Sequence, residues 1–228
     1  MDRAQYAEKE SKYFGLARQE ILPLVPECAA RVLEIGCGAG GTLQWLRSIR
    51  PVAFAAGVEL MSGPAEQARR VCEDVQVGDI EQMPSLPYAP HSFDLILALD
   101  VLEHLVAPWS LIPRLHALLR PGGHLITSIP NVAHYSVSLP LLCGQWTYVK
   151  SGILDATHLR FFVRGSVEQL VTCSGLVIDK EEQVVRVPWD LHRVIGWRRN
   201  QRLQARAGRY LPHLFTFQFL MRAKNVTH

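Results

Sequence analysis

Residues 31–41 constrain the fold of this chain more than any other segment. An apolar run, Arg31 to Ile35, leads into a turn with glycines at 36, 38 and 41. Glycine tolerates the backbone angles of a tight turn, and this spacing is the G-x-G-x-x-G pattern of a strand that turns into a helix beside a nucleotide. Taken alone, the glycines also fit a plain strand-to-helix turn in any α/β protein.

A carboxylate beside this turn narrows the choice of ligand. Glu34 lies two positions before Gly36, where it would repel the pyrophosphate of a dinucleotide. S-adenosylmethionine has no phosphate and carries an ammonium and a sulfonium, so the turn suits this cofactor better. Glu59 ends the next apolar run, 21 residues after Gly38, where a carboxylate can hold two ribose hydroxyls. Both kinds of cofactor contain a ribose, so Glu59 supports a nucleoside and Glu34 favours S-adenosylmethionine.

Size and cysteine usage bound the class of protein. With 228 residues and 48% hydrophobic content, the chain is expected to form one domain, residues 1–228, with a buried core. Five scattered cysteines without a C-x-x-C pair indicate neither a disulfide framework nor a zinc site. No run approaches the roughly 20 apolar residues of a membrane span. We therefore expect a cytoplasmic protein without a transmembrane segment.

The formal net charge of +3 conceals a basic segment. Seven arginines and one acid, Asp190, lie between Arg186 and Arg209. A solvated helix face is the favoured interpretation, because the apolar residues of this segment do not separate from the arginines on a helical wheel. Peripheral membrane contact stays an alternative, and a nucleic-acid partner is not favoured. The oligomeric state cannot be read from the sequence.

Apolar runs alternate with helical patterns along the first half of the chain. Strands are predicted at 31–35, 54–59, 75–77, 93–98 and 124–129, with helices at 42–50, 63–72 and 108–119. This order predicts an α/β, Rossmann-like, doubly wound and mostly parallel sheet, with a ligand at the carboxyl ends of its strands. We divide the domain into a helical cap (1–30), a cofactor-binding core (31–130), a substrate-covering insertion (131–164) and a C-terminal part (165–228) with the arginine-rich segment. In that last part we expect a helix at 165–174 and strands at 176–187 and 214–223.

With these motifs in place, the chain resembles class I S-adenosylmethionine-dependent methyltransferases. The resemblance rests on VLEIGCGAG (32–40), GVEL (57–60), GDIE (78–81), SFDLILALDVLEHL (92–105) and LRPGGHL (119–125). It implies a seven-stranded sheet and S-adenosyl-L-methionine as cofactor. SIPNVAH (128–134) and GILDATHLRFF (152–162) resemble a bacterial branch associated with glycan biosynthesis. That branch implies a sugar hydroxyl, or another small hydroxylated acceptor, as the group that is methylated.

The resemblance also implies roles for single residues. Glu34 would bind near the methionine amino group, Gly36, Cys37 and Gly38 would pass under the methionine, and Glu59 would hold the ribose. The remaining cofactor-binding candidates flank the adenine or line the mouth of the pocket: Leu60, Met61, Asp79, Ile80, Leu99, Asp100 and His104. Tyr6, Tyr13 and Arg18 either cap the pocket or are ordinary core and surface residues.

Transfer of a methyl group to a hydroxyl needs a proton acceptor, and histidine is the usual choice. His158 is the first candidate for this catalytic base, because Asp155 lies three residues before it and could orient the imidazole; His134 is the second. Arg160 could hold an anionic group of the acceptor, and Asn131 and Tyr135 are further substrate-binding candidates. Alternatively, Asp155, His158 and Arg160 form a structural polar network. Suitable ligand types occur, but none at a paired spacing such as H-E-x-x-H, so no metal is predicted.

The sequence leaves three functions open. An O-methyltransferase acting on a sugar or another small hydroxylated acceptor leads. A methyltransferase fold that serves as a non-catalytic or regulatory binding subunit is the second, and the intact acids and glycines speak against it. An RNA methyltransferase that uses the arginine-rich segment is the third.

Overall fold

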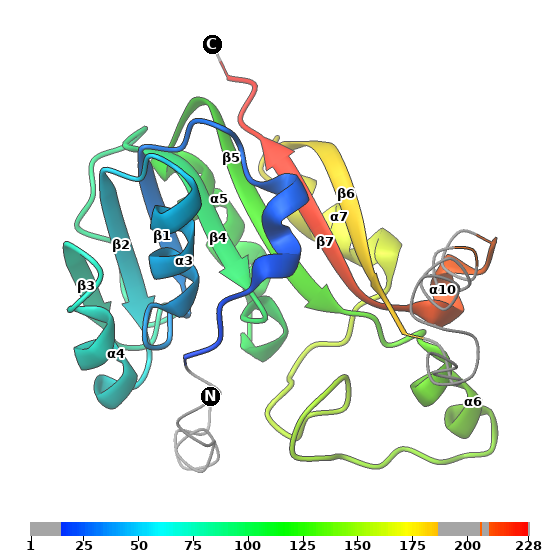
Figure 1. Ribbon diagram of the computed structural model, residues 1–228. Coiled ribbons are helices and arrows are strands. Elements are labelled where there is room, and N and C mark those ends of the chain that lie inside the picture. Colours follow the sequence, from blue (N-terminus) through cyan, green and yellow to red (C-terminus); the bar gives the residue numbers. More distant parts are fainter. Residues whose placement is uncertain (1–14, 187–205, 207–209, 228) are drawn as a thin grey trace.

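The computed structural model describes residues 15–186, 206 and 210–227 (Figure 1). Tyr6, Tyr13 and nearly all of the arginine-rich segment lie outside the described residues. Seven strands form one sheet in the order β3-β2-β1-β4-β5-β7-β6. Their bounds are β1 Arg31–Ile35, β2 Phe54–Glu59, β3 Asp74–Val77, β4 Phe93–Leu99, β5 Leu119–Pro130, β6 Val177–Val185 and β7 Thr216–Lys224.

The first five strands run parallel, and β7 pairs antiparallel with both β5 and β6. In Figure 1 the arrow of β7 therefore points opposite to that of β5. The predicted Rossmann-like, mostly parallel sheet of seven strands is confirmed. β4 lies at its centre and is buried along its whole length, as expected for a strand covered on both faces.

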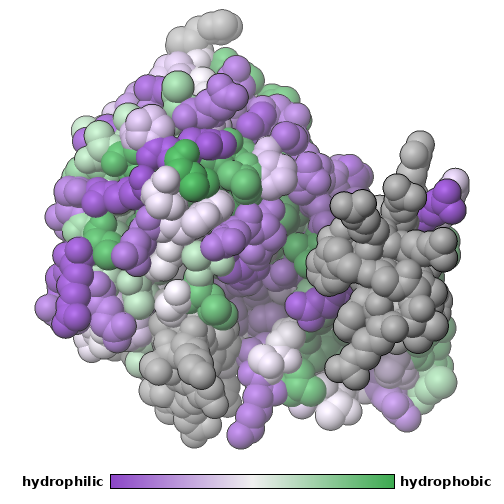
Figure 2. All heavy atoms as spheres, in the orientation of Figure 1, coloured by the Kyte–Doolittle hydropathy of each residue, from purple (hydrophilic) through white to green (hydrophobic). Residues whose placement is uncertain are grey.

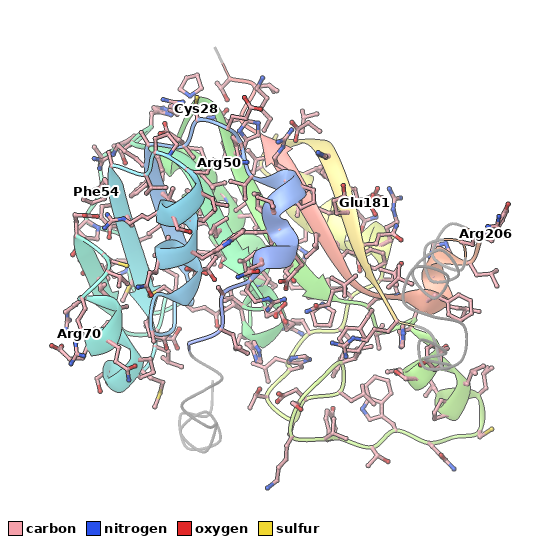
Figure 3. The ribbon with its side chains drawn as sticks, viewed as in Figure 1. Cys28, Arg50, Phe54, Arg70, Glu181 and Arg206 are labelled. Atoms are coloured by element: carbon pink, nitrogen blue, oxygen red, sulfur yellow. The ribbon has the colours of Figure 1, made fainter. Side chains whose placement is uncertain are left out.

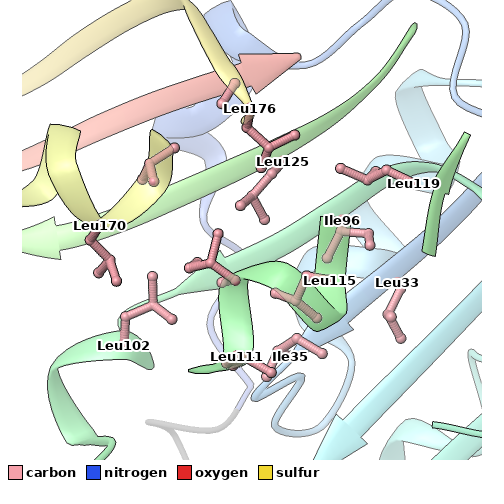
Figure 4. Close-up of a cluster of buried hydrophobic side chains, with 14 of the residues drawn as sticks. Leu33, Ile35, Ile96, Leu102, Leu111, Leu115, Leu119, Leu125, Leu170 and Leu176 are labelled. Atoms are coloured by element: carbon pink, nitrogen blue, oxygen red, sulfur yellow. The ribbon is translucent and has the colours of Figure 1, made fainter. Parts of the chain in front are cut away.

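Helices cover both faces of the sheet, and each face has its own hydrophobic core. On one face pack the 3-10 helix η1 (Gln19–Leu24) and the helices α3 (Gly41–Ile49) and α4 (Ser62–Ala68). On the other pack α5 (Pro108–Leu118) and α7 (Arg164–Thr172), which meet the sheet through the leucines and isoleucines of Figure 4. Leu111, Leu115 and Leu118 recur at helical spacing on α5 and are buried. Burial of apolar helix residues against both faces of the sheet stabilises the layered fold.

The predicted insertion, 131–164, leaves the sheet after β5 and lies beneath the carboxyl ends of the strands in Figure 1. It contains the helix α6 (Tyr135–Leu142) and returns so that Asn131 and Phe162, at its two ends, form a β-bridge. The 3-10 helix η2 (Leu102–His104) lies next to its returning part, because the Glu103 carbonyl accepts hydrogen bonds from the amides of Leu159 and Arg160, both at 2.9 Å. The insertion is thus anchored at both ends.

The C-terminal elements close the second half of the sheet. The Arg164 guanidinium on α7 pairs with Glu181 on β6 at 2.7 Å, and Figure 3 labels Glu181 on that strand. The short helix α10 (Pro212–Phe215) leads into β7. Within the described residues, no helix has both the length and the apolar character to cross a membrane. Hydrophilic and hydrophobic side chains are interspersed on the face shown in Figure 2.

Candidate functional site

The turn after β1 has the backbone that its glycines predict. Gly36 and Gly38 have φ angles of 70° and 54°, a region that side chains disfavour. The amides of Gly36 and Cys37 donate to the Val58 carbonyl of β2, at 2.7 and 3.2 Å. A Cβ atom on Gly36 would lie 2.4 Å from the side chain of Val101. The turn is therefore pressed between β2 and the segment that follows β4.

The third glycine of the motif serves a different contact. A Cβ atom on Gly41 would lie 2.4 Å from the carbonyl oxygen of Gly15. The N-terminal segment thus crosses the start of α3 so closely that no side chain fits there. Further along this segment, the Arg18 amide donates to the Thr42 hydroxyl at 3.3 Å. The chain before β1 therefore packs directly on the glycine turn.

Two buried carboxylates face the turn, and their surroundings differ. The Glu59 oxygens accept hydrogen bonds from the amides of Gly38 and Met61, each at 2.9 Å. Glu34 is 3% exposed, and its Oε2 atom has no hydrogen-bond partner among the described residues. Burial raises the pKa of Glu34 to about 8, although Thr42 and the Arg18 guanidinium oppose the shift. Glu34 is thus a buried acid that gains from a cation placed beside it.

Both acids belong to one cavity at the carboxyl ends of β1, β2 and β4. Eleven of the twelve predicted cofactor-binding residues line it: Glu34, Gly36, Cys37, Gly38, Glu59, Leu60, Asp79, Ile80, Leu99, Asp100 and His104. Met61 is not among the lining residues. It is the N-cap residue of α4, and its amide donates a hydrogen bond to Glu59. The lining also includes Leu16, Arg18, Thr42, Gly78 and Val101, of which the sequence had suggested only Arg18. The exposed Cys28 lies at the other end of the sheet (Figure 3).

Arg18 closes one side of the cavity. Its guanidinium pairs with the Asp100 carboxylate, whose other oxygen accepts from Ser128 Oγ and Gln218 Nε2, both at 2.8 Å. Asp100 follows β4 with a positive φ of 55°, which turns the chain sharply towards η2. The structure therefore supports the interpretation of Arg18 as a residue of the pocket.

The predicted base lies in a cluster of polar side chains behind this cavity. His104 on η2 is buried and lines the cavity, and its ring lies 4.6 Å from that of His158, centroid to centroid. His158 Nε2 lies 4.0 Å from a Glu103 carboxylate oxygen, and its Nδ1 lies 2.9 Å from the Ile153 carbonyl. The Asp155 carboxylate accepts from the amide and the hydroxyl of Thr157, at 2.9 and 2.7 Å.

The other predicted residues of the insertion lie outside the cavity lining. Asn131 is fully buried, and its side chain bonds the carbonyls of His213 and Thr216 and the amide of Ala133. Arg160 donates to the Val106 carbonyl and lies over the Trp109 ring. The contacts of Asn131 and Arg160 are thus with other parts of the protein, as expected for side chains with a structural role.

His134 and Tyr135 start α6 beyond the cavity lining. His134 Nδ1 lies 2.8 Å from Ser136 Oγ and its Nε2 lies 3.1 Å from the Arg186 carbonyl. Burial lowers the pKa of His134. The Tyr135 ring packs beside that of His134, with centroids 4.2 Å apart. Both ring nitrogens of His134 are thus engaged within the protein.

The sheet topology and the acid pair define a class I methyltransferase fold with an S-adenosylmethionine site. The Glu34 carboxylate oxygen that has no partner among the described residues fits the cofactor's ammonium, and Glu59 at the end of β2 fits its ribose diol. The sequence profile of a methyltransferase domain family matches residues 6–181. The chain belongs to this methyltransferase domain family, and S-adenosyl-L-methionine is the cofactor that the family implies.

Similar proteins agree with this assignment. A ubiquinone biosynthesis O-methyltransferase from Neisseria meningitidis is 33% identical over 156 residues, 65% of this chain and 64% of that protein. A trans-aconitate 2-methyltransferase from Methylobacterium nodulans is 34% identical over 131 residues, 57% of this chain and 50% of that protein. The chain therefore spans less than two thirds of the length of these relatives.

Solved structures share the fold at low sequence identity. The S-adenosylmethionine-dependent methyltransferase from Mesorhizobium loti superposes with a TM-score of 0.63 at 16% identity. The superposition covers 95% of this chain and 99% of that structure. This superposition supports the architecture of the chain.

Proposed function

We propose that this chain transfers the methyl group of S-adenosylmethionine to an oxygen atom of a small hydroxylated acceptor, with a sugar hydroxyl as the leading candidate. The observation that carries the proposal is that one cavity is lined both by the acid pair Glu34 and Glu59 and by the imidazole of His104. The relatives named as O-methyltransferases support an oxygen acceptor, and the SIPNVAH and GILDATHLRFF motifs support a sugar.

The chemistry asks little covalent work of the protein, because the sulfonium already activates the methyl group. When bound, the cofactor supplies this electrophilic methyl. The residues that line the cavity would hold the cofactor, align the acceptor with the methyl group and exclude water. As the C–O bond formed, the C–S bond would break with its electron pair left on sulfur, and the hydroxyl proton would pass to a base.

The proton acceptor belongs to the cluster of Glu103, His104 and His158 in this proposal. His104 lines the cavity and His158 packs against it, so a proton that leaves the acceptor reaches an imidazole without crossing the sheet. His134 is a poorer base, because its two ring nitrogens contact Ser136 and Arg186. His158 stays the first candidate for the base, as the sequence suggests, and His104 replaces His134 as the second because it lines the cavity; Asp155 acts on the cluster through Thr157.

Calorimetry with S-adenosylhomocysteine tests the cofactor half of the proposal. We expect Glu59→Gln to weaken binding at least tenfold, because a carboxylate forms stronger hydrogen bonds to two hydroxyls than an amide does. Glu66→Gln, on the exposed face of α4, is the matched control and leaves binding unchanged. Absence of binding by the wild-type chain contradicts the proposal.

Turnover tests the acceptor half. The purified chain is supplied with S-adenosylmethionine and panels of sugars, catechols and carboxylic acids, and formation of S-adenosylhomocysteine is measured. We expect turnover with at least one hydroxylated compound, and its loss in His158→Ala with the cofactor affinity retained. Turnover confined to carboxylic acids contradicts the proposed acceptor class. Cofactor binding without turnover on any panel supports the regulatory subunit instead.

A further inference from the structure

Three side chains that metals commonly bind converge behind the cofactor cavity. Glu103 and His104 come from η2, His158 comes from the insertion, and one potential ligand atom of each lies within 4.8 Å of the others. All three side chains are buried. They come from two segments that the fold brings together, so no ligand spacing in the sequence reveals them.

Both imidazoles are oriented by the protein through Nδ1. His158 Nδ1 lies 2.9 Å from the Ile153 carbonyl and His104 Nδ1 lies 3.1 Å from the Thr157 carbonyl. A carbonyl can only accept, so each Nδ1 carries a hydrogen, and in the neutral ring the lone pair is then on Nε2. This arrangement, with Nδ1–H bonded to a backbone carbonyl, is the one that orients histidines which bind metals.

A second contact fixes the tautomer of His104. Its Nδ1 also lies 3.2 Å from the Thr157 hydroxyl oxygen, and that hydroxyl donates its own hydrogen to Asp155 at 2.7 Å. The hydroxyl oxygen can therefore only accept from His104. Asp155 is thus a positioning residue, because it acts on His104 through Thr157.

The chemistry of the cluster suits a divalent cation. Two neutral imidazoles and one carboxylate form a ligand set that first-row transition metals favour, with open positions for other ligands. Metal–ligand bonds of about 2.1 Å place neighbouring ligand atoms roughly 3–4 Å apart, so small side-chain adjustments suffice.

We propose that Glu103, His104 and His158 form a binding site for a divalent transition-metal cation behind the cofactor cavity, which His104 lines. The sequence alone predicts no metal, and this proposal departs from that prediction. Its catalytic consequence rests on the proposed function. His104 lines the cavity, so a cation that it helps to hold would lie close to the cavity.

The bound cation changes the route of the proton. The acceptor hydroxyl coordinates through oxygen and loses its proton to solvent, because a cation lowers the pKa of a coordinated hydroxyl. The oxygen lone pair then forms the C–O bond, the C–S bond breaks, and sulfur keeps the electrons. His158 then acts as a ligand, and the cation takes over the work of the base.

Cobalt(II) tests the site directly. The full chain, without an affinity tag, is stripped with a chelator and titrated with cobalt chloride while visible absorption and heat are recorded. We expect one equivalent to bind with an absorption band of nitrogen and oxygen ligands. Glu103→Gln and His158→Gln should each weaken binding at least tenfold. His124→Gln is the matched control, because His124 also lies near a carboxylate, 3.6 Å from Asp179, and its loss should leave binding unchanged.

A milder variant guards against loss of the fold. Thr157→Val removes only the hydroxyl that supports His104, and we expect cobalt binding about tenfold weaker, as for other supporting contacts of metal ligands. Circular dichroism verifies the fold of each variant. No cobalt band in the wild-type chain, or equal binding by wild type and Glu103→Gln, overturns the proposal. Calorimetry of S-adenosylhomocysteine on the stripped wild type separates this failure from failure of the proposed function, since cofactor binding does not require the cation.

Discussion

Replacing Glu34 by glutamine removes one acidic group from the cavity and keeps the shape of the side chain. The Glu34 pKa lies at about 8 in the folded chain, against an ordinary value of 4.5, because burial disfavours the charged form. This difference corresponds to roughly 5 kcal/mol, at about 1.4 kcal/mol for each pKa unit. Without cofactor, wild-type Glu34 is therefore a strongly destabilising residue once it ionises.

The sign of the pH dependence follows from the two pKa values. Between pH 4.5 and about 8, the unfolded chain ionises Glu34 while the folded chain keeps the proton, so the stability of the wild type falls as the pH rises. Above about 8 both states are ionised and the loss levels off. Glu34→Gln does not titrate. We expect it to be more stable than wild type by roughly 3 kcal/mol at pH 7 and roughly 5 kcal/mol at pH 9, measured by urea unfolding.

We expect bound cofactor to lower the pKa of Glu34 again, and this change can be measured as the release of a proton. At pH 7 about nine tenths of Glu34 is protonated in the free chain, and an ammonium beside it favours the ionised form. Binding of S-adenosylhomocysteine should therefore release close to one proton from Glu34. Calorimetry in buffers of different ionisation enthalpy measures this release. Subtraction of the Glu34→Gln value removes the contribution of the ligand's own amine, and equal proton release by both chains refutes the reasoning.

Three further changes test the contacts around the site. Gly41→Ala places a methyl group 2.4 Å from the Gly15 carbonyl, so we expect a loss of about 1–3 kcal/mol in unfolding free energy, and an unchanged melting curve contradicts the close approach. Asn131→Ala leaves the carbonyls of His213 and Thr216 and the amide of Ala133 without this partner, and should cost roughly 3 kcal/mol in urea unfolding while the affinity for S-adenosylhomocysteine is unchanged. His134→Gln should retain most of the turnover, because the His134 ring nitrogens contact Ser136 and Arg186; a loss as large as that of His158→Ala would return His134 to the catalytic candidates.

Periodicity and turn residues were sufficient to predict the elements of the sheet. β1 and β2 begin and end at the predicted residues, because apolar runs bounded by glycine or charged residues leave little choice. β5 begins at Leu119, five residues earlier than expected, since the segment 119–123 pairs at its start with Phe93. The place of β7 between β5 and β6 depends on pairing partners far apart in the chain, which local patterns do not encode.

The residues of the candidate site likewise fall into those that local sequence patterns predict and those that they do not. Residues at strand ends, such as Glu34, Glu59 and Asp100, were predictable because the carboxyl ends of parallel strands meet at one edge. Arg160 and Asn131 were harder to interpret, since a polar side chain in an insertion can face a ligand or a backbone carbonyl. Thr42 has a signal in retrospect, because it follows the last glycine of the motif in the first turn of α3.

Both ends of the insertion are anchored, so the loop between them can change independently of the sheet. Its ends are fixed to each other by the Asn131–Phe162 bridge and to η2 by the Glu103 carbonyl. Because the ends are already held together, lengthening or replacing the intervening loop adds only slowly to the entropy of closure. We therefore expect the part of this loop before Asp155 to tolerate insertions and replacements, without loss of the sheet that forms the cofactor cavity or of the cluster around His158.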